Sequence, residues 1–252
     1  MTSLETAEPI GTDTTIMTTS AIDVTLMLQA GSDAMICAAA KVSTSPEDAL
    51  AIARDQDASK GLLRYLMRHS HGSPFEVGTM TFFVHCPVFV MREIQRHRIG
   101  FSFNEESQRY RTVGSAFWTP PPDRLLDTPD GYKSARPTFE RGTKEQFDLI
   151  SSHDQVLYDA AYTAYEAEVA NGVAREVARR LLPVGIFTSA WVTCNPRSLM
   201  HFLSLRTHRP DAAYPSYPQR EIEQVAEAME AIFAQHWPIT ARLFDELGRV
   251  AP

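Results

Sequence analysis

The side chains best suited to chemistry lie between Glu93 and Arg111, in the sequence EIQRHRIGFSFNEESQRYR. This stretch holds four arginines and one histidine in a chain whose formal net charge is -7. A guanidinium stays charged and presents a planar fork of donors, which suits phosphate and carboxylate groups. The stretch therefore predicts a local anion-binding site. The acidic total charge, by contrast, argues against bulk attraction to nucleic acid or to an anionic membrane.

These residues alone also allow a simpler interpretation, in which the basic residues only stabilise the end of a helix and bind no ligand. A helical pattern runs from Val88 into RHR, and cations in a last helical turn complement the helix dipole without any ligand. Further arginines lie in apolar helical surroundings, however: Arg179 in VAREVARRLLP and Arg206 in LMHFLSLRT. Several arginines of this kind favour a site where anionic groups converge.

The strands and helices that must position these arginines do not alternate in a regular order along the sequence. Patterns rich in β-branched and aromatic residues predict strands over 23–31, 76–86 and 189–195. Amphipathic patterns and capping signals predict helices over 33–43, 57–70, 88–98, 144–172, 173–183, 197–207 and 217–237. We predict a mixed α/β (α+β) fold, with a mainly antiparallel twisted sheet and flanking helices in a single domain. The lack of simple βαβ alternation argues against a Rossmann sheet.

The composition sets limits on the domain and its surroundings. Hydrophobic residues make up 44% of the 252 positions, enough for a sizeable core. Residues 1–20 are polar and aperiodic, which predicts a flexible extension before one domain over 21–252. Residues 117–142 hold five of the 16 prolines and predict an irregular connection. No long apolar run or signal peptide is recognised, so we expect a cytoplasmic protein without a membrane partner.

Neither the cysteines nor the histidines form a metal-binding pattern. Cys37, Cys86 and Cys194 are far apart and odd in number, which argues against a disulfide framework or a zinc site. His69 and His71 are two residues apart rather than four, and His85 is distant from both. We therefore expect no metal, and expect the cysteines to be small buried hydrophobes.

The sequence also contains blocks that resemble a known family. RHRIGFSFNEESQRY resembles the signature of the flavin-dependent thymidylate synthases, in which Arg-His-Arg is followed by seven residues and a serine. HGSPFE before the signature, and VAREVARRLLP and NPRSLMHFLSLR after it, stand in the family's order and spacing, so the resemblance covers roughly residues 60 to 245. Here eight residues separate Arg98 from Ser107, and we expect the extra residue at Gly100-Phe101. Residues 207–220 form a longer link than is common, with Tyr217 where a histidine is frequent.

The resemblance implies two sets of binding residues. The implied FAD contacts are His71, Ser73, Arg96, His97, Arg98, Ile99, Glu105, Asn195, Arg197 and His201. The implied dUMP contacts are Glu93, Gln95, Arg96, Glu105, Glu106, Ser107, Gln108, Arg109, Arg179 and Arg206. Glu105 would lie between the flavin and the nucleotide. Arg206 would be the catalytic residue, because a guanidinium near the uracil stabilises developing negative charge without proton transfer.

The activity that the resemblance implies is the reductive methylation of dUMP to dTMP. Methylenetetrahydrofolate would supply the carbon, reduced FAD the hydride, and NADPH the electrons that regenerate the flavin. Family members are homotetramers with active sites at subunit interfaces. Two alternatives stay open: a related flavin enzyme that modifies another pyrimidine nucleotide, for example by hydroxymethylation, and a non-enzymatic nucleic-acid-binding module.

Overall fold

The computed structural model describes residues 15–127 and 138–252, and the described chain forms two compact units. Of the described residues, unit 1 comprises 15–21, 107–127 and 138–187. Unit 2 comprises Ile22–Glu106 and Thr188–Pro252. The chain therefore passes between the units after Ala21, Glu106 and Phe187. Each unit is described by itself below.

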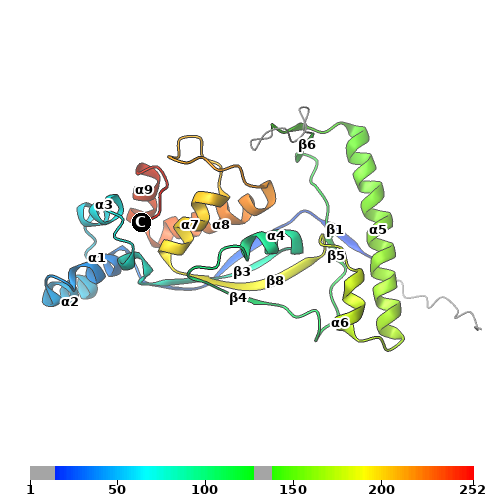
Figure 1. Ribbon diagram of the computed structural model, residues 1–252, viewed down its shortest axis with the longest axis horizontal. Helices are drawn as coiled ribbons and strands as arrows, with labels where there is room; N and C mark the ends of the chain where they lie inside the picture. The colour runs from blue at the N-terminus through cyan, green and yellow to red at the C-terminus, as the bar shows by residue number, and fades with distance from the viewer. Residues whose placement is uncertain (1–14, 128–137) are drawn as a thin grey trace, which may run out of the picture. The chain divides into compact units, whose positions relative to one another are not determined.

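Unit 2 is built on a sheet with the strand order β2-β3-β8-β4 (Figure 1). The strands are β2 (Asp23–Ala30), β3 (Thr79–Pro87), β4 (Phe101–Glu105) and β8 (Phe187–Cys194). The pairs β2–β3 and β4–β8 are antiparallel. Thr81 contacts Thr193 and His85 contacts Ser189, each at 2.9 Å, so β3 and β8 also run in opposite directions. Every pairing within this sheet is thus antiparallel.

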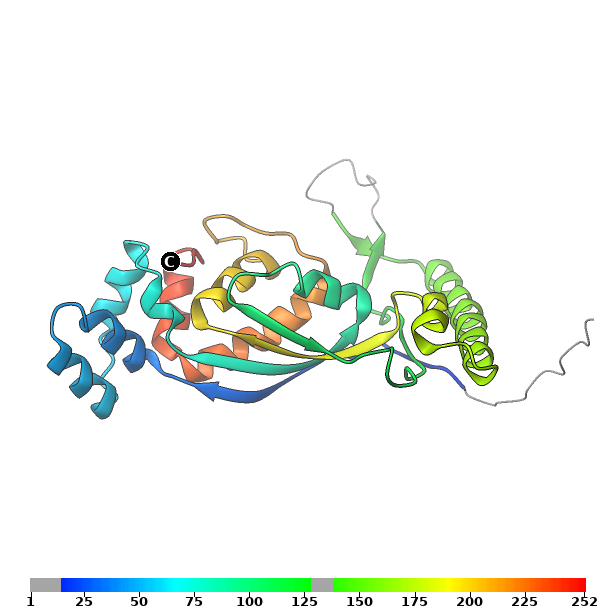
Figure 2. The same cartoon turned by 60° about the horizontal axis from the view of Figure 1, so that its bottom comes forward.

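Helices cover one face of this sheet, as the second view shows (Figure 2). The helices over the sheet are α4 (Val88–Ile94), α7 (Pro196–Arg206) and α8 (Arg220–His236). At one end of the sheet lie α1 (Asp33–Lys41), α2 (Pro46–Asp55), α3 (Lys60–Arg68) and α9 (Pro238–Glu246), with a 3-10 turn η1 (Ser73–Glu76). The side chains of Ser32, Ser45 and Ser59 accept hydrogen bonds from the first turns of α1, α2 and α3. These caps satisfy backbone donors that a helix start leaves without an intrahelical partner.

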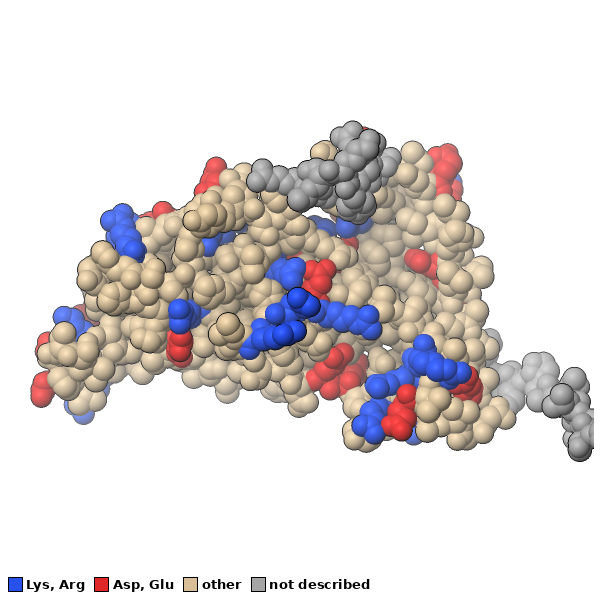
Figure 3. Space-filling model, in the orientation of Figure 1, with Lys and Arg blue, Asp and Glu red and all other residues tan. Residues whose placement is uncertain are grey.

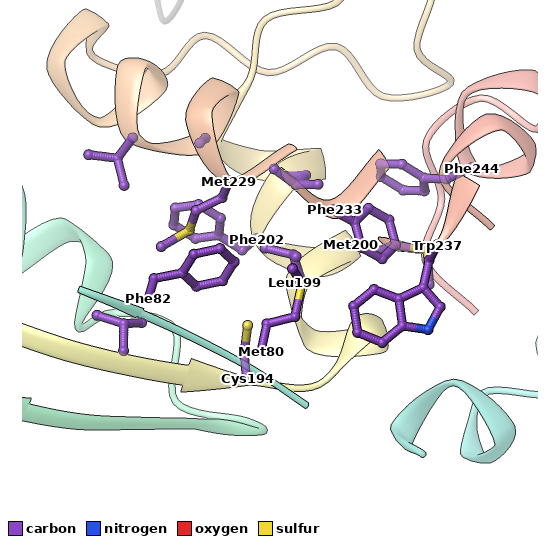
Figure 4. Close-up of a cluster of buried hydrophobic side chains, with 14 of the residues drawn as sticks. Met80, Phe82, Cys194, Leu199, Met200, Phe202, Met229, Phe233, Trp237 and Phe244 are labelled. Atoms are coloured by element: carbon purple, nitrogen blue, oxygen red, sulfur yellow. The ribbon is translucent and has the colours of Figure 1, made fainter. Parts of the chain in front are cut away.

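The core lies between the sheet and these helices (Figure 4). Successive strand residues point to opposite faces, so alternate positions of β3 and β8 face the helices. Met80 and Phe82 of β3 pack with Cys194 of β8, and α7 and α8 contribute Phe202 and Phe233. Burial raises the pKa of Cys86 and Cys194, which keeps both thiols protonated. The prediction that the cysteines are buried hydrophobes is confirmed, because all three are free and buried.

A buried carboxylate near the start of unit 2 in the sequence, on α1, binds the first turn of α9 near the end of the chain. Asp33, 5% exposed in α1, accepts hydrogen bonds from the backbone N–H groups of Ile239 (2.8 Å) and Thr240 (3.0 Å) and from the Thr240 hydroxyl (2.6 Å). These N–H groups belong to the first turn of α9, where a negative charge also complements the helix dipole. The helix α9 is thus capped by a residue about two hundred positions earlier.

Unit 1 is organised around a long helix, α5 (Lys144–Ala170). Strand β1 (Met17–Thr19) pairs with β5 (Ala116–Trp118) in parallel, and β6 (Leu125–Asp127) pairs with β7 (Glu140–Arg141). The short helix α6 (Arg175–Ala178) leads into η2 (Arg179–Leu181). From α5, the hydroxyl of Tyr162 donates to the Val113 carbonyl, and that of Tyr165 accepts from the Val113 N–H. These two buried tyrosines hold the segment before β5 against α5.

The structure confirms the predicted fold class, a mixed α/β fold with an antiparallel sheet and flanking helices. Several predicted bounds were wrong. The helix expected over 88–98 ends at Ile94, so the RHR residues lie in a turn, and the helix expected over 173–183 is reduced to α6 and η2. Most of the predicted flexible extension, residues 1–14, lies outside the described residues, as does 128–137 in the predicted irregular connection. Met17–Thr19 form a strand rather than a flexible end, because β5 supplies their backbone partners.

Strands β4, β5, β6 and β7 and helices α2 and α9 were not predicted from the sequence. That residues 21–252 form one domain stays a prediction. No helix among the described residues is long and apolar enough to cross a membrane.

Candidate functional site

The candidate catalytic residue, Arg206, is held by two side chains of the signature block. It closes α7, and its Nε donates to His97 Nε2 at 3.0 Å. Its Nη1 donates to Glu93 Oε2 at 2.6 Å, and its Nη2 reaches the Glu93 carbonyl at 3.4 Å. The Arg206 side chain is 20% exposed and that of Glu93 is 29% exposed. The guanidinium therefore has a fixed orientation while one part of it remains accessible.

His97 serves this arrangement as a neutral acceptor. Burial, followed by the nearby charges of Arg206 and His201, lowers the pKa of His97 to about 4. Because Nε2 accepts from Arg206, the proton of the neutral ring must lie on Nδ1. The imidazole also packs edge-on against Phe202, with ring centroids 4.8 Å apart. His97 thus orients Arg206 without adding a competing positive charge.

Glu105 is oriented by partners on two elements. It ends β4, and Gln95 Nε2 donates to its Oε2 at 2.8 Å while Thr188 Oγ1 donates to its Oε1 at 2.8 Å. The neighbouring Glu106 accepts from the Ser189 N–H at 3.2 Å. Both carboxylates are partly buried. Gln95, Glu105 and Glu106 of the implied nucleotide set are therefore fixed along the pairing of β4 with β8.

The remaining signature residues are exposed. Arg96, Arg98 and Ile99 project into solvent, Ile99 with 91% of its surface accessible. Neither arginine forms an ion pair within the described part of the chain. Basic side chains gather over α4 in the space-filling view (Figure 3). This concentration of unpaired guanidinium groups is suited to an anionic ligand such as a phosphate.

Gly100 occupies the place where the extra residue of the signature was expected. Its φ is +69°, a conformation that side-chain-bearing residues rarely adopt. A Cβ there would also lie 2.0 Å from Ser198 Oγ and 3.0 Å from Asn195 Nδ2. The turn after RHR thus needs glycine both for its conformation and for its close approach to α7.

The implied FAD residues of the NPRSLMH block start α7. Asn195 caps the helix by accepting the Ser198 N–H at 2.8 Å. Arg197 donates to Glu76 Oε1 and to the Pro252 carbonyl, each at 2.6 Å. His201 is exposed, but part of its side chain is covered. This partial burial, followed by the nearby charge of Arg197, lowers the pKa of His201. His71 and Ser73 are exposed, His71 shortly before η1 and Ser73 at its first position, and the rings of Tyr65 and His71 are 5.8 Å apart.

The other implied nucleotide residues lie in unit 1. Ser107 Oγ accepts the backbone N–H of Arg109 at 3.3 Å, and Gln108 is partly buried. The Arg109 guanidinium pairs with Glu176, at 2.8 Å from Nε and 2.7 Å from Nη2. Arg179 is exposed and has no ion pair among the described residues. The roles of these residues stay predictions.

The long segment 207–220 is anchored to α7 and α8. The His208 N–H donates to Glu223 at 2.7 Å, and the His208 ring lies 4.9 Å from that of Tyr217. The Ser216 hydroxyl donates to the Leu205 carbonyl at 2.6 Å. Tyr217 stands where the family resemblance led us to expect a histidine. Its ring packs beside the ring of His208, a histidine earlier in the same segment.

Sequence reasoning missed several residues that position the site. Thr188 holds Glu105, while Gly72 and Glu76 contact Arg197. The last two belong to the HGSPFE block, so their place in a recognised motif was the available signal. Thr188 had no such signal, because its role depends on the register of β4 against β8.

The geometry defines a class of protein: one that binds an anionic ligand through arginines, some oriented by carboxylate and imidazole partners and others exposed without an ion pair among the described residues. Among residues 15–127 and 138–252, no group of three or more His, Cys, Asp or Glu side chains could hold a metal ion. Exposed arginines beside a capped helix start are suited to the phosphates of a flavin nucleotide.

Comparisons with known proteins identify the family. A model of the family described as "Thymidylate synthase complementing protein" matches residues 25–239. A flavin-dependent thymidylate synthase of Streptomyces coelicolor is 49% identical over 237 residues, covering 92% of this chain and 94% of that protein. One from Tropheryma whipplei is 43% identical over 236 residues, covering 92% and 96%. The chain belongs to the flavin-dependent thymidylate synthase family, so the family prediction is confirmed.

Solved structures agree with this assignment. The UMP/dUMP methylase PolB of Streptomyces cacaoi, bound with 5-Br UMP, superposes with a TM-score of 0.84 at 44% identity. The match covers 94% of this chain and all of the PolB chain. A second PolB structure, bound with 5-Br dUMP, gives the same TM-score at 46% identity. These structural neighbours are nucleotide-modifying enzymes, and the prediction that the chain is an enzyme of this type is confirmed.

Proposed function

We propose that this protein converts dUMP to dTMP. The methylene carbon of 5,10-methylenetetrahydrofolate becomes bonded to C5 of the uracil, and the C5 proton is released. Two electrons and a proton, delivered as a hydride, reduce the methylene to a methyl group, and tetrahydrofolate leaves. NADPH returns the two electrons to the flavin. The observation that carries the proposal is Arg206, held by Glu93 and His97 next to exposed signature arginines.

The protein groups bind, orient and polarise. When bound, reduced FAD supplies the hydride. Arg206 would stabilise negative charge on the uracil ring, and its bonds to Glu93 and His97 mean that it needs no reorganisation during the reaction. Arg109 and Arg179 would bind the phosphate, and Glu105 would lie between the two ligands. Arg96, Arg98 and Arg197 would bind the flavin nucleotide. The buried, protonated cysteines supply no thiolate nucleophile.

The proposal is tested with the purified protein under anaerobic conditions. We expect flavin absorbance bands, which bleach on addition of NADPH and bleach faster when dUMP is present. Adding methylenetetrahydrofolate should then restore the oxidised bands and yield dTMP by mass spectrometry. A protein that binds no FAD and consumes no NADPH would contradict the proposal. A salt-dependent affinity for DNA in such a protein would revive the nucleic-acid-binding alternative.

A second candidate substrate is UMP. It is favoured by the neighbour PolB, whose structures are described as those of a UMP/dUMP methylase. Parallel assays with dUMP and UMP give the ratio of the two kcat/KM values, and we expect dUMP to be preferred. Mass spectrometry of the same reactions separates methylation from hydroxymethylation, because the hydroxymethylated product is heavier by one oxygen atom.

We also propose that the protein is a cytoplasmic homotetramer with active sites at subunit interfaces. The face of the sheet opposite the core supports a protein contact, because Trp191 of β8 is 45% exposed. Met27 and Leu28 of β2 are 47% and 51% exposed. Light scattering after gel filtration would measure the mass of the assembly. A monomer that still forms dTMP would contradict the shared active site.

A further inference from the structure

Arg197 is restrained on three sides. Its Nε donates to the Pro252 carbonyl at 2.6 Å, and its Nη1 donates to Glu76 Oε1 at 2.6 Å. Its third neighbour is the backbone of Gly72. The Arg197 side chain is nevertheless 36% exposed, so the guanidinium is both fixed and accessible.

Gly72 provides space rather than an unusual backbone conformation. Its φ of -75° and ψ of -32° are ordinary right-handed values that alanine adopts freely. A Cβ at this buried position would lie 2.4 Å from Cζ, 2.5 Å from Nε and 2.7 Å from Nη2 of Arg197. The guanidinium therefore lies against the glycine backbone, and a single methyl group would displace it.

The segment that supplies the Pro252 carbonyl is itself anchored at its other end. Arg249, 6% exposed, pairs with Glu230 at 2.6 Å and also with Asp245. Its Nη2 donates to Thr207 Oγ1 at 2.9 Å. Thr207 follows Arg206 directly and caps the end of α7. Residues 249–252 thus form a strap that contacts α7 near both ends, at Thr207 and at Arg197.

We propose that Gly72, Glu76 and this strap position Arg197 for an anionic group of the flavin nucleotide. The inference rests on the proposed function, because it takes Arg197 as a flavin-binding residue. A guanidinium has five N–H donors, of which two are used here within the described residues. The remaining donors are held in one orientation, which reduces the conformational entropy lost when a ligand binds. Gly72, Glu76 and the strap are positioning elements, since they act through Arg197.

The first test is Gly72→Ala. We expect its dissociation constant for FAD, measured by titration of the FAD-free protein, to rise roughly 10-fold or more, because a charge-assisted hydrogen bond is lost or misdirected. Gly61→Ala is the matched control. A Cβ at Gly61, in α3, meets only Ser59 Oγ at 3.9 Å, so its FAD affinity should match that of the unsubstituted protein.

A double-mutant cycle separates positioning from general damage. If Gly72 acts through Arg197, then adding Gly72→Ala to Arg197→Ala should cause no further loss of FAD affinity. Two further changes are Glu76→Gln and a chain that stops at Arg249. Each should weaken FAD binding several-fold in the protein that keeps Arg197. Each should have little effect when Arg197→Ala is already present. Equal effects in both backgrounds would overturn the proposal. These two variants carry the test if Gly72→Ala does not fold.

The outcomes also distinguish this inference from the proposed function. If the unsubstituted protein binds FAD and forms dTMP but Gly72→Ala binds FAD equally well, only the positioning role fails. If the unsubstituted protein binds no FAD, both fail. The melting temperature of each FAD-free variant shows whether any loss of affinity comes from unfolding.

Discussion

Two groups of arginines in this protein differ in how they are held. Arg206 and Arg197 each donate to partners from distant parts of the chain, at distances of 2.6 to 3.0 Å for the shortest contacts. Arg96, Arg98 and Arg179 are exposed and have no ion pair in the described residues. A preorganised guanidinium suits a step that needs fixed geometry, whereas an unpaired one gains its first charged partner when ligand binds. The difference suggests that the first group binds in a fixed orientation, Arg206 at the uracil and Arg197 at the flavin nucleotide, and that the second group captures phosphates.

The comparison is tested most severely by Arg206→Lys. Lysine keeps the positive charge but cannot donate simultaneously to His97 and to Glu93 with a planar fork. We expect kcat for dTMP formation to fall roughly 100-fold to 1,000-fold, with FAD affinity unchanged. Single-turnover kinetics with reduced enzyme measure the step directly. A kcat close to that of the unsubstituted protein would show that charge alone suffices.

Arg179 and Arg180 offer a matched pair for the second group. Arg180 forms two bonds to Glu168, at 2.6 and 2.8 Å, whereas its neighbour Arg179 has no ion pair among the described residues. We expect Arg179→Ala to raise KM for dUMP roughly 10-fold or more, because a phosphate contact is lost. Arg180→Ala should leave KM unchanged. If the two variants behave alike, the absence of an internal partner does not mark a phosphate ligand.

His97 makes the orienting group sensitive to acid. Its pKa is lowered from 6.5 to about 4, so between these values the unfolded chain binds more protons than the folded one. The free energy of unfolding should therefore fall as pH decreases from 6.5 toward 4, and His97 should add no pH dependence above 6.5. Melting curves of the protein and of His97→Asn test this. The stability difference between them should shrink toward pH 4 and stay constant at higher pH.

The smallest effect is expected for Glu93→Gln. Glutamine has the same length as glutamate, and its side-chain carbonyl can still accept from Arg206 Nη1. The substitution removes a countercharge but keeps the orientation, so we expect kcat to change less than about fivefold. Glu93→Ala, which removes the acceptor, should cost more. Steady-state kinetics of the two variants would show whether orientation or charge matters at Glu93.

Local signals predicted the elements that local interactions stabilise. The Asn171-Gly172 signal placed the end of α5, and of the two expected caps of α1, Ser32 or Asp33, the structure uses Ser32. The helix α4 was predicted too long because RHR suits a last turn. The chain instead tightens there, with Arg96 N–H to the Glu93 carbonyl and His97 N–H to the Ile94 carbonyl, before Gly100 turns it into β4. Strand β1 depends on partners about a hundred residues away, which its own sequence does not indicate.

The site depended still more on distant contacts. Arg206 lies 113 residues from Glu93 and 109 from His97, so no spacing rule connects them. Their common membership in a site was implied only by the family resemblance. Charge and composition alone left a solvated cationic turn as an adequate explanation for RHR. The neutral state of His97 could not be predicted either, because it results from burial and from the arginine that the fold brings next to it.

The cap that Asp33 provides to α9 has a consequence for synthesis of the protein. Translation proceeds at roughly 5 to 20 residues per second, so Thr240 follows Asp33 by roughly 10 to 40 seconds. During this delay Met80 and Phe82 of β3 lack the cover that α7 and α8 later provide. The nascent chain therefore presents an unfinished apolar surface. We expect fragments that end before α7 to aggregate, and the intact chain to depend on chaperones that hold it until its last helices emerge.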